Sequence, residues 1–575
     1  MPERLRKPDR LRRLDRLRRL DRLRRLRTLG LSILLALAPL CFAQNPVAPA
    51  VPSEQGAYRI AGRIVSATDG HALERATVEI LHSKTRKPVA SEVAGEDGGF
   101  AFANLGAGAY VLEGRRHGYI VANYLQHQGF STAIITGAGV DTESLVLKLT
   151  PEADLNGRIT DEAGDPLRHA MVALYAESRS SGEGRVARVR SVQTDDLGGY
   201  DIGQLAPGRY FLSATATPWY AVHPPSARPA GAMGPLMGVV DSVDPSLDVA
   251  YPTTFYPDAT DSSGAAAIAL QGGEQVEADI RLSPQPAVTI SIPRSPEDKP
   301  VTFPQLQRAV FNGVEPVNAE TRTTATEYSI VGVPPGQYAL KQMSAQPGGI
   351  AKSMTVDLTS RNVEIDAGRG EDLGNVKVLL KAADGATLPP QMQVSLIGKD
   401  PAQTINGLSN DKDEAAITGV EPGEYHFAVQ GGQRLYYVTR VLSGGRPLEG
   451  NRLHVAAGAT PSVTVVAGPG SGAVEGFATL GGKPASGAMV LLLPADQVRD
   501  IDFFWRDQSD LDGSFHLSGI PPGKYTLLAI EDGWDLEWRR ADVLARYLPL
   551  GVPVVVAENG KSPLKLRDAL VVEPR

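Results

Sequence analysis

Cysteine is almost absent from this chain. A single cysteine, Cys41, stands among 575 residues. One thiol excludes an intrachain disulfide framework, and it also excludes the clustered cysteines of zinc sites. The fold must therefore be stabilised by its hydrophobic cores alone.

Long apolar runs are also lacking. The run Leu29–Leu40 has about 12 residues, whereas a membrane-spanning helix needs about 20. It follows a basic segment and ends near Cys41 and Ala43, which is typical of a secretory signal peptide. We predict cleavage after Ala43; an uncleaved anchor and a lipoprotein at Cys41 are the alternatives. The mature chain would then have no transmembrane segment and would be exported to the periplasm, the outer cell surface or the medium.

Basic charge is scarce outside the leader. Residues 1–28 carry a net charge of +9 and the whole chain carries −7, which leaves −16 for the rest. A nucleic-acid-binding protein needs a basic face, so we expect no nucleic acid partner. The leader itself repeats DRLRRL at 9–14, 15–20 and 21–26, which indicates an expanded leader or, alternatively, a basic helix for a membrane surface or nucleic acid.

Signatures of catalysis are lacking too. The chain contains no H-E-x-x-H and no G-x-S-x-G, and its nine histidines are scattered. His71 and Glu74 form an H-x-x-E motif, but they lie in a turn whose equivalents in other copies of the repeat lack these residues. Asp510 and Asp512 beside Gly513 would suit a calcium ion, although turn chemistry explains them as well. We therefore expect a non-enzymatic protein with no cofactor and no metal.

A repeated turn is what the sequence has in abundance. Gly-x-Tyr closes five similar stretches, with intervals between the tyrosines of 100, 128, 87 and 100 residues. A period near 100 residues predicts five copies of one small domain. The predicted structural turn residues are Gly108, Tyr110, Gly208, Tyr210, Gly336, Tyr338, Gly423, Tyr425, Gly523 and Tyr525.

The strands around this turn alternate apolar and polar residues, as in Tyr525, Leu527 and Ala529. An Asp-Gly turn with positive φ at glycine precedes them, and Pro-Gly suits a type II turn. We expect the tyrosine ring to be buried, with its hydroxyl on a backbone group. Helical spacing occurs mainly in 534–547. The pattern predicts an all-β protein, a tandem array of about five antiparallel β-sandwiches.

These motifs resemble the carboxypeptidase regulatory-like domain, a transthyretin-like (prealbumin-like) sandwich grouped with carbohydrate-binding-like folds. Copies 1, 2 and 5 match in the opening part (61–81, 156–175 and 475–494) and in the closing part with Gly-x-Tyr, whereas copies 3 and 4 keep mainly the closing part. The resemblance implies an accessory module of secreted bacterial proteins. Predicted boundaries are 1–43 signal peptide with basic leader, 44–56 linker, 57–150 sandwich 1, 151–285 sandwich 2 with inserted loop 217–263, 286–370 sandwich 3, 371–467 sandwich 4 and 468–575 sandwich 5.

Aromatic residues offer the clearest ligand candidates. Three of the four tryptophans, Trp505, Trp534 and Trp538, lie in the last unit, where they could form a stacking platform with Asp510 and Asp512 as polar partners. Alternatively, Trp534 and Trp538 fold the 531–547 loop onto its own sandwich. A second candidate set lies in the insertion: Trp219, Tyr220, Tyr251, Phe255 and Tyr256.

The leading function hypothesis is an exported binding, adhesion or scaffold module of the cell envelope. Its partners would be a polysaccharide or an envelope protein, and the oligomeric state is left open. The alternatives are a carbohydrate-binding protein that uses the last unit and an accessory component linked to a carboxypeptidase.

Overall fold

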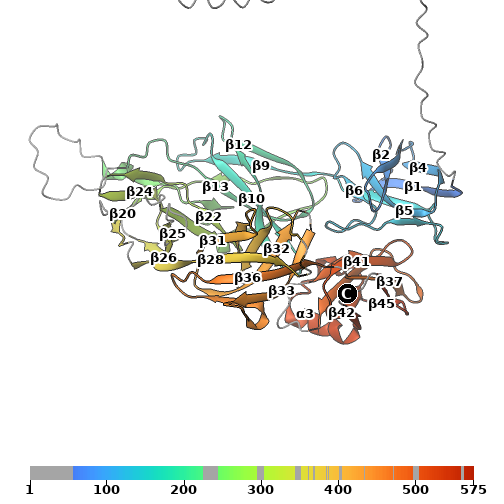
Figure 1. Ribbon diagram of the computed structural model, residues 1–575. Coiled ribbons are helices and arrows are strands. Elements are labelled where there is room, and N and C mark those ends of the chain that lie inside the picture. Colours follow the sequence, from blue (N-terminus) through green and yellow to red (C-terminus); the bar gives the residue numbers. More distant parts are fainter. Residues whose placement is uncertain are drawn as a thin grey trace, which may run out of the picture. The chain divides into compact units, whose positions relative to one another are not determined.

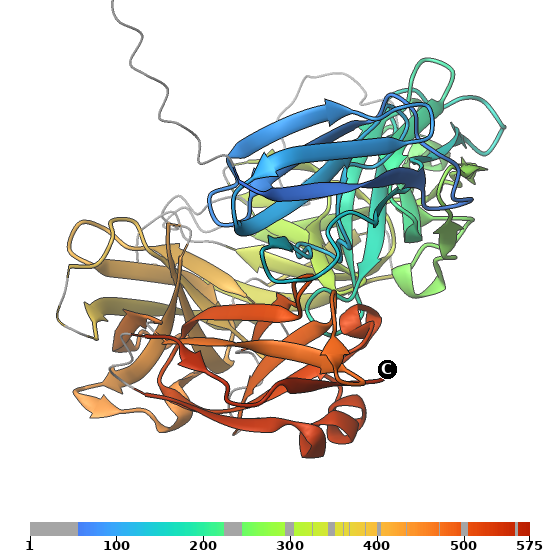
Figure 2. The same ribbon diagram turned by 90° about the vertical axis from the view of Figure 1, so that its right-hand side faces the viewer.

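The computed structural model describes residues 56–575 apart from 224–243, 294–303, 325, 343–350, 360–361, 367–368, 384, 386, 400–403, 433, 471, 496–503 and 558–561. Gly56–Arg575 forms one compact unit. The predicted signal peptide and most of the predicted linker lie outside the described residues. Strands dominate the described chain, as Figures 1 and 2 show. Within the described ranges, no helix is long and apolar enough to cross a membrane.

The first sandwich packs two sheets around one core. One sheet has the order β4-β1-β8, and the other has β3-β2-β5-β6 with β7 also on β5. Buried residues alternate along the strands, as in Ile60 and Ile64 of β1 or Phe100 and Phe102 of β4. The strands are β1 (Tyr58–Ser66), β2 (Thr77–His82), β3 (Pro88–Val93), β4 (Gly99–Leu105), β5 (Gly108–Arg115), β6 (Ala122–Asn123), β7 (Ile134–Thr136) and β8 (Leu145–Leu149).

The second sandwich repeats this plan. Its sheets are β12-β9-β17, with β18 on β9, and β11-β10-β13-β15, with β16 on β13. Part of the insertion joins it through β15, while β14 pairs with β19. The elements are β9 (Ala153–Thr160), β10 (Met171–Ser178), β11 (Arg185–Gln193), β12 (Gly199–Leu205), β13 (Gly208–Thr215), η1 (Pro245–Leu247), β14 (Val249–Ala250), β15 (Thr254–Phe255), η2 (Ser262–Gly264), β16 (Ile268–Leu270), β17 (Gln275–Glu277), β18 (Ile280–Arg281) and β19 (Gln285–Pro286).

The third and fourth sandwiches share a continuous sheet, because β26 pairs with β28. Lys341 and Glu421 form an ion pair of 3.1 Å across the same junction. The third has β20 (Val288–Pro293), β21 (Gln305–Val310), β22 (Gly313–Pro316), β23 (Glu320–Thr323), β24 (Glu327–Val333), β25 (Gly336–Gln342), β26 (Ala351–Leu358) and β27 (Asn362–Glu364). The fourth has β28 (Glu371–Ala382), β29 (Gln393–Ile397), β30 (Ile405–Leu408), β31 (Glu414–Val420), β32 (Gly423–Gly431), β33 (Arg434–Ser443), β34 (Arg446–Pro447), η5 (Glu449–Asn451), β35 (Arg452–Val455) and β36 (Ser462–Pro469).

The last sandwich adds the main helical segment, where helical spacing predicted one. Its elements are β37 (Gly472–Leu480), β38 (Lys483–Pro484), β39 (Met489–Pro494), β40 (Trp505–Gln508), β41 (Ser514–Ile520), β42 (Gly523–Ile530), η6 (Gly533–Asp535), α3 (Ala541–Tyr547), η7 (Leu548–Leu550), β43 (Val552–Val556), β44 (Leu564–Lys565) and β45 (Leu570–Glu573). Most pairings are antiparallel, but each sandwich also closes with a parallel pair, such as β1 with β8.

Five large hydrophobic clusters fill the five sandwiches. The fold is therefore an all-β tandem array of sandwiches. The exact domain boundaries stay a prediction.

The five repeated tyrosines make the contact that the sequence suggested. Each hydroxyl donates a hydrogen bond to the backbone carbonyl four residues upstream, as in Tyr210 to Ala206 at 2.7 Å. The other four are Tyr110 to Gly106, Tyr338 to Pro334, Tyr425 to Glu421 and Tyr525 to Pro521. The glycine two residues before lies against the ring: a Cβ on Gly523 would stand 3.3 Å from the Tyr525 ring.

The prediction of a type II turn at Pro-Gly is wrong. The glycine of this motif has a positive φ only at Gly336, where φ is 154°. The left-handed residue lies four positions earlier, at Asn104, Gln204, Gly332, Gly419 and Gly519, where each strand register shifts by a β-bulge. The Asp-Gly turn is as predicted, with φ of 73° at Gly98, 72° at Gly198 and 82° at Gly513.

Candidate functional site

The predicted aromatic platform of the last sandwich is not assembled as a surface. Trp534 is 4% exposed and Trp538 is 1% exposed, so neither indole offers a free face. Both pack in one cluster with Met489, Leu491 and Tyr547. The alternative that these residues fold the 531–547 loop onto its own sandwich agrees with this burial.

Trp505 belongs to the opposite face of the same sheet. It pairs with Leu492 of β39 and packs against the central core of the last sandwich, with its ring 5.7 Å from the Tyr525 ring. Leu492 and Leu491 of β39 point to opposite faces of the sheet, and Trp505 packs in the cluster of Leu492 whereas Trp534 packs in that of Leu491. Asp512 accepts hydrogen bonds from Ser514 within its own turn. The five platform residues are therefore not brought together.

Trp534 instead lies in a contact between the first and the last sandwich. Its ring stacks on His127 at 5.5 Å with an interplanar angle of 2°, and Phe130 lies 5.2 Å away. Gln128 donates a hydrogen bond to the Trp534 carbonyl oxygen at 3.0 Å. We name this contact, formed by residues 125–133, 506–511 and Trp534, the first–last interface.

Hydrogen bonds run through the buried centre of the first–last interface. The Gln508 side chain donates to the Leu125 carbonyl oxygen and to the Thr132 hydroxyl, and Thr132 donates to the Ser509 carbonyl oxygen at 3.1 Å. Thr132 and Ser509 are 0% exposed and Gln508 is 2% exposed. Buried polar groups that lack a partner are costly, so these residues fix the pairing of the two surfaces.

Asp510 makes a different contact from Asp195, its equivalent in the second sandwich. Its structural equivalent in the second sandwich, Asp195, accepts hydrogen bonds from Leu197 and Gly199 in its own turn. Asp510 occupies the same turn position, yet its carboxylate accepts a hydrogen bond from the Ala133 N–H at 2.8 Å. Burial raises the pKa of Asp510 to about 7, and the charges of Asp507 and Asp512 act in the same direction. Burial also raises the pKa of Asp507.

Arg506 supplies a cation to the same interface. Its guanidinium lies over the rings of Phe130, Phe504 and Trp534 at 5.3–5.7 Å and donates to the Gln128 side chain. Burial lowers the pKa of Arg506. Cation–π contacts strengthen when they are desolvated, so Arg506 ties the aromatic residues of both sandwiches together.

Sequence reasoning missed the first–last interface, although one signal was available. Leu511 is apolar in a turn where the equivalent residues are Asp196 and Glu96. In the structure its side chain packs against the core of the first sandwich, and its N–H donates to the Ala133 carbonyl oxygen at 3.0 Å. The apolar residue at this turn position is therefore covered by the first sandwich, whereas Leu197, one position later in the equivalent turn of the second sandwich, is 66% exposed.

The insertion candidates are also separated by the fold. Tyr220 and Tyr251 both donate to the Glu162 carboxylate, which anchors the insertion on the second sandwich. Phe255 instead joins Tyr175 around Phe311, which reaches in from the third sandwich. The remaining two residues differ: Trp219 is 83% exposed, while Tyr256 packs against the second core. In the described ranges, no group of three or more His, Cys, Asp or Glu residues could hold a metal ion.

Comparison with known families places a carboxypeptidase regulatory-like domain at residues 154–226. This match lies within the predicted second sandwich, residues 151–285. A search of curated protein sequences found no match.

Several solved structures are similar to the chain. The Bacillus anthracis TIE protein is 10% identical, with a TM-score of 0.17, over 71% of this chain and 74% of that one. A streptococcal ancillary pilin is 11% identical, with a TM-score of 0.20, over 50% of this chain and 100% of that one. GBS52, a minor pilin of Streptococcus agalactiae, is 12% identical, with a TM-score of 0.20, over 40% of this chain and 97% of that one. At these values the similarity carries no functional argument.

Proposed function

We propose that this chain is an exported, non-enzymatic β-sandwich protein that acts as a scaffold or adhesion module of the cell envelope. The observation that carries the proposal is the first–last interface. Gln508 and Asp510 use side chains to bind residues more than 370 positions away in the sequence. A chain of independent modules would not need such contacts, whereas a scaffold needs domains in fixed positions.

Contacts between other neighbours support the same role. Phe311 inserts from the third sandwich between Tyr175 and Phe211 of the second, at ring distances of 5.1 and 4.9 Å. The Tyr175 hydroxyl donates to Glu315 at 3.1 Å. Together with the sheet shared by the third and fourth sandwiches, these contacts limit domain motion in the array.

Export and rigidity are tested separately. Fractionation of cells that produce the full chain should place it outside the cytoplasm with Gln44 as its first residue. An intact leader on a cytoplasmic protein would refute export.

Amide hydrogen exchange should show slow exchange in both 125–133 and 506–511, and both segments should exchange faster in Trp534→Ala. Fast exchange of these segments in the unaltered chain would refute a fixed first–last arrangement.

The carbohydrate-binding alternative loses its proposed site in the last sandwich, because Trp534 and Trp538 are buried. An accessory role beside a carboxypeptidase stays a prediction that rests on the family resemblance alone. Fold-level resemblance is a weak basis for function.

A further inference from the structure

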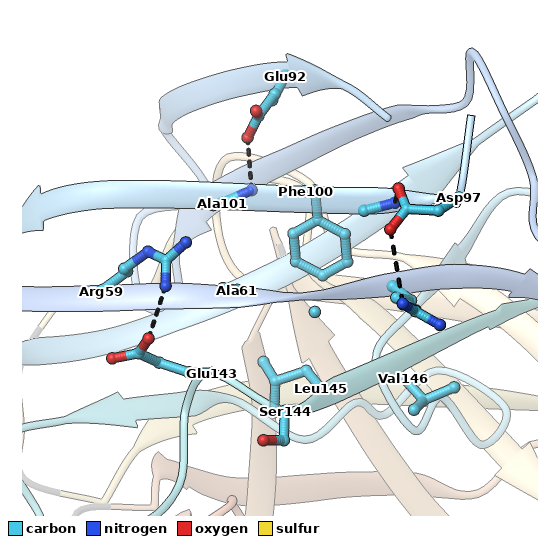
Figure 3. Close-up of a pocket in the computed structure, with 13 residues that line it drawn as sticks. Arg59, Ala61, Glu92, Asp97, Phe100, Ala101, Glu143, Ser144, Leu145 and Val146 are labelled. Atoms are coloured by element: carbon cyan, nitrogen blue, oxygen red, sulfur yellow. Dashed lines mark hydrogen bonds and ion pairs between the residues drawn. The ribbon is translucent and has the colours of Figure 1, made fainter. Parts of the chain in front are cut away.

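The first sandwich carries a groove on the outer face of its β4-β1-β8 sheet, with a volume of about 560 Å³. Figure 3 shows the residues that line this groove. Ile60 and Phe100 point into the core, so their neighbours Ala61 and Ala101 point outward. These two alanines are register partners and form the floor with Ser144.

Two ion pairs lie at the ends of this floor. Arg59 pairs with Glu143 at 2.7 Å, and Arg63 pairs with Asp97 at 3.6 Å. All four side chains are about half exposed or more, and Figure 3 shows Arg59 and Glu143 on one side of Ala61 and Asp97 on the other. Arg59 and Arg63 are four residues apart on one strand, which separates the two pairs by about 13 Å.

The floor of the groove consists of small residues, as does the equivalent position of the third sandwich, where Ser291 lies opposite Ser329. At the same register position the second sandwich has Asn156 opposite Asp201, and the last has Glu475 opposite His516. In the last sandwich these two side chains contact each other at 3.0 Å and cover the sheet. The fourth sandwich places Lys377 opposite Ala416.

The edge of this sheet is closed to strand addition at the groove. β4 is an edge strand, and its Ala101 N–H donates to the Glu92 carboxylate at 2.7 Å. An added peptide strand needs free backbone groups at the edge. At the β4 edge an occupant is therefore recognised through side chains, and β8 is the other edge strand of this sheet.

The charges around the groove further limit the occupant. Two guanidinium groups and three carboxylates line it; two of the carboxylates pair with the guanidinium groups, and the third, Glu92, accepts from the Ala101 N–H. Strongly anionic ligands meet the carboxylates, and cationic ligands meet the guanidinium groups. Hydroxyl groups both donate and accept hydrogen bonds, so a polyhydroxylated neutral ligand can use carboxylates as acceptors and guanidinium groups as donors.

We propose that the groove lined by Arg59, Ala61, Arg63, Asp97, Ala101 and Glu143 binds a neutral oligosaccharide. The small floor allows sugar rings to lie flat on the sheet, and the two ion pairs contact hydroxyls at either end. This inference goes beyond the scaffold role, since a scaffold could lack any glycan ligand. It also places the ligand on the first sandwich rather than on the last.

Isothermal titration of the full chain with cello-, malto-, xylo- and manno-hexaose tests the proposal, with hexagalacturonate as an anionic comparison. We expect binding of at least one neutral hexaose. Ala61→Trp should fill the groove and weaken this binding about tenfold or more. Asn156→Trp, at the equivalent position of the second sandwich, is the matched control and should leave the affinity unchanged.

A second variant tests the groove without introducing a large side chain such as the tryptophan of Ala61→Trp. Glu143→Gln preserves the size of the side chain but removes the charge that positions Arg59, and it should weaken binding while hydrogen exchange of β1 stays the same. Binding of hexagalacturonate alone, absence of binding, or full affinity in Ala61→Trp would overturn the proposal. None of these results would alter the fractionation or exchange results that test the scaffold role.

Discussion

The carboxylate of Asp510 accepts a hydrogen bond from the backbone N–H of Ala133, across 377 residues of sequence. The same turn position holds Asp195 in the second sandwich, where the carboxylate binds its own turn. One residue type at one repeat position therefore stabilises a turn in one copy and a domain contact in another.

The first–last interface should weaken as the pH rises. Burial raises the pKa of Asp510 from an ordinary value near 3.8 to about 7. The folded state therefore holds this proton more tightly than the unfolded state, so stability is greatest at acidic pH and falls between about pH 4 and pH 7. One pKa unit corresponds to about 1.4 kcal/mol, so we expect a loss of about 2 to 4 kcal/mol over this range.

Trp534 fluorescence during denaturant unfolding at pH 5 and pH 8 measures this loss. The charged groups near Asp510 are Asp507 and Asp512, and the titratable group near Asp507 is His516. Asp510→Asn keeps an acceptor for Ala133 but cannot ionise, so the pH dependence should become smaller, and Asp507, whose pKa burial also raises, accounts for the remainder. A transition in Asp510→Asn with the same pH dependence as in the unaltered chain would contradict this assignment.

Trp534→Ala should separate the two sandwiches locally. The change removes the stack on His127 and the contacts to Phe130 and Arg506. Truncation of a buried aromatic residue costs about 3 to 5 kcal/mol. Thermal unfolding followed by circular dichroism checks the stability, and Trp219→Ala serves as the control because its indole is 83% exposed. Equal effects of the two changes would argue against a packed role for Trp534.

Phe311→Ala should loosen the junction of the second and third sandwiches. Phe311 lies against three aromatic rings of the second sandwich, and its N–H donates to the Ser262 hydroxyl at 3.0 Å. We expect a loss of about 3 to 5 kcal/mol and faster proteolysis near this junction. Val314→Ala in the same hairpin is 51% exposed and should have an effect within about 0.5 kcal/mol. Unchanged proteolysis in Phe311→Ala would show that the junction does not depend on this ring.

Tyr210→Phe should destabilise the second sandwich modestly. It removes only the hydroxyl that donates to the Ala206 carbonyl oxygen at 2.7 Å. A single hydrogen bond of this kind contributes about 0.5 to 1.5 kcal/mol. Chemical denaturation of the full chain gives the difference, and Tyr525→Phe should behave alike because the last sandwich repeats the contact. A stabilising effect in either variant would be inconsistent with the hydrogen bond.

Much of the fold could be predicted because it depends on local physics. Alternating burial in β8 and β12, positive φ at Gly98 and Gly198, and the repeated tyrosine contact all follow from short sequence segments. The turn at Pro-Gly was predicted wrongly because the residue with left-handed backbone lies in a β-bulge, four residues before the glycine of the motif. In the first two sandwiches this residue is Asn104 or Gln204, and neither residue type indicates a positive φ as clearly as glycine does. Glycine at this place is explained by the ring of the following tyrosine.

The sequence by itself determined that this protein is a repeated all-β chain, since alternation and turn residues act over a few positions. Only the tertiary structure decided what the exposed positions of each repeat do. Trp534 and Asp510 look like surface residues in the sequence, yet they meet residues 127–133 because two distant domains pack together. Ala61 and Ala101 form a groove only because β1 and β4 place them side by side. Contacts between residues far apart in the chain depend on the packed fold, and no short sequence segment contains them.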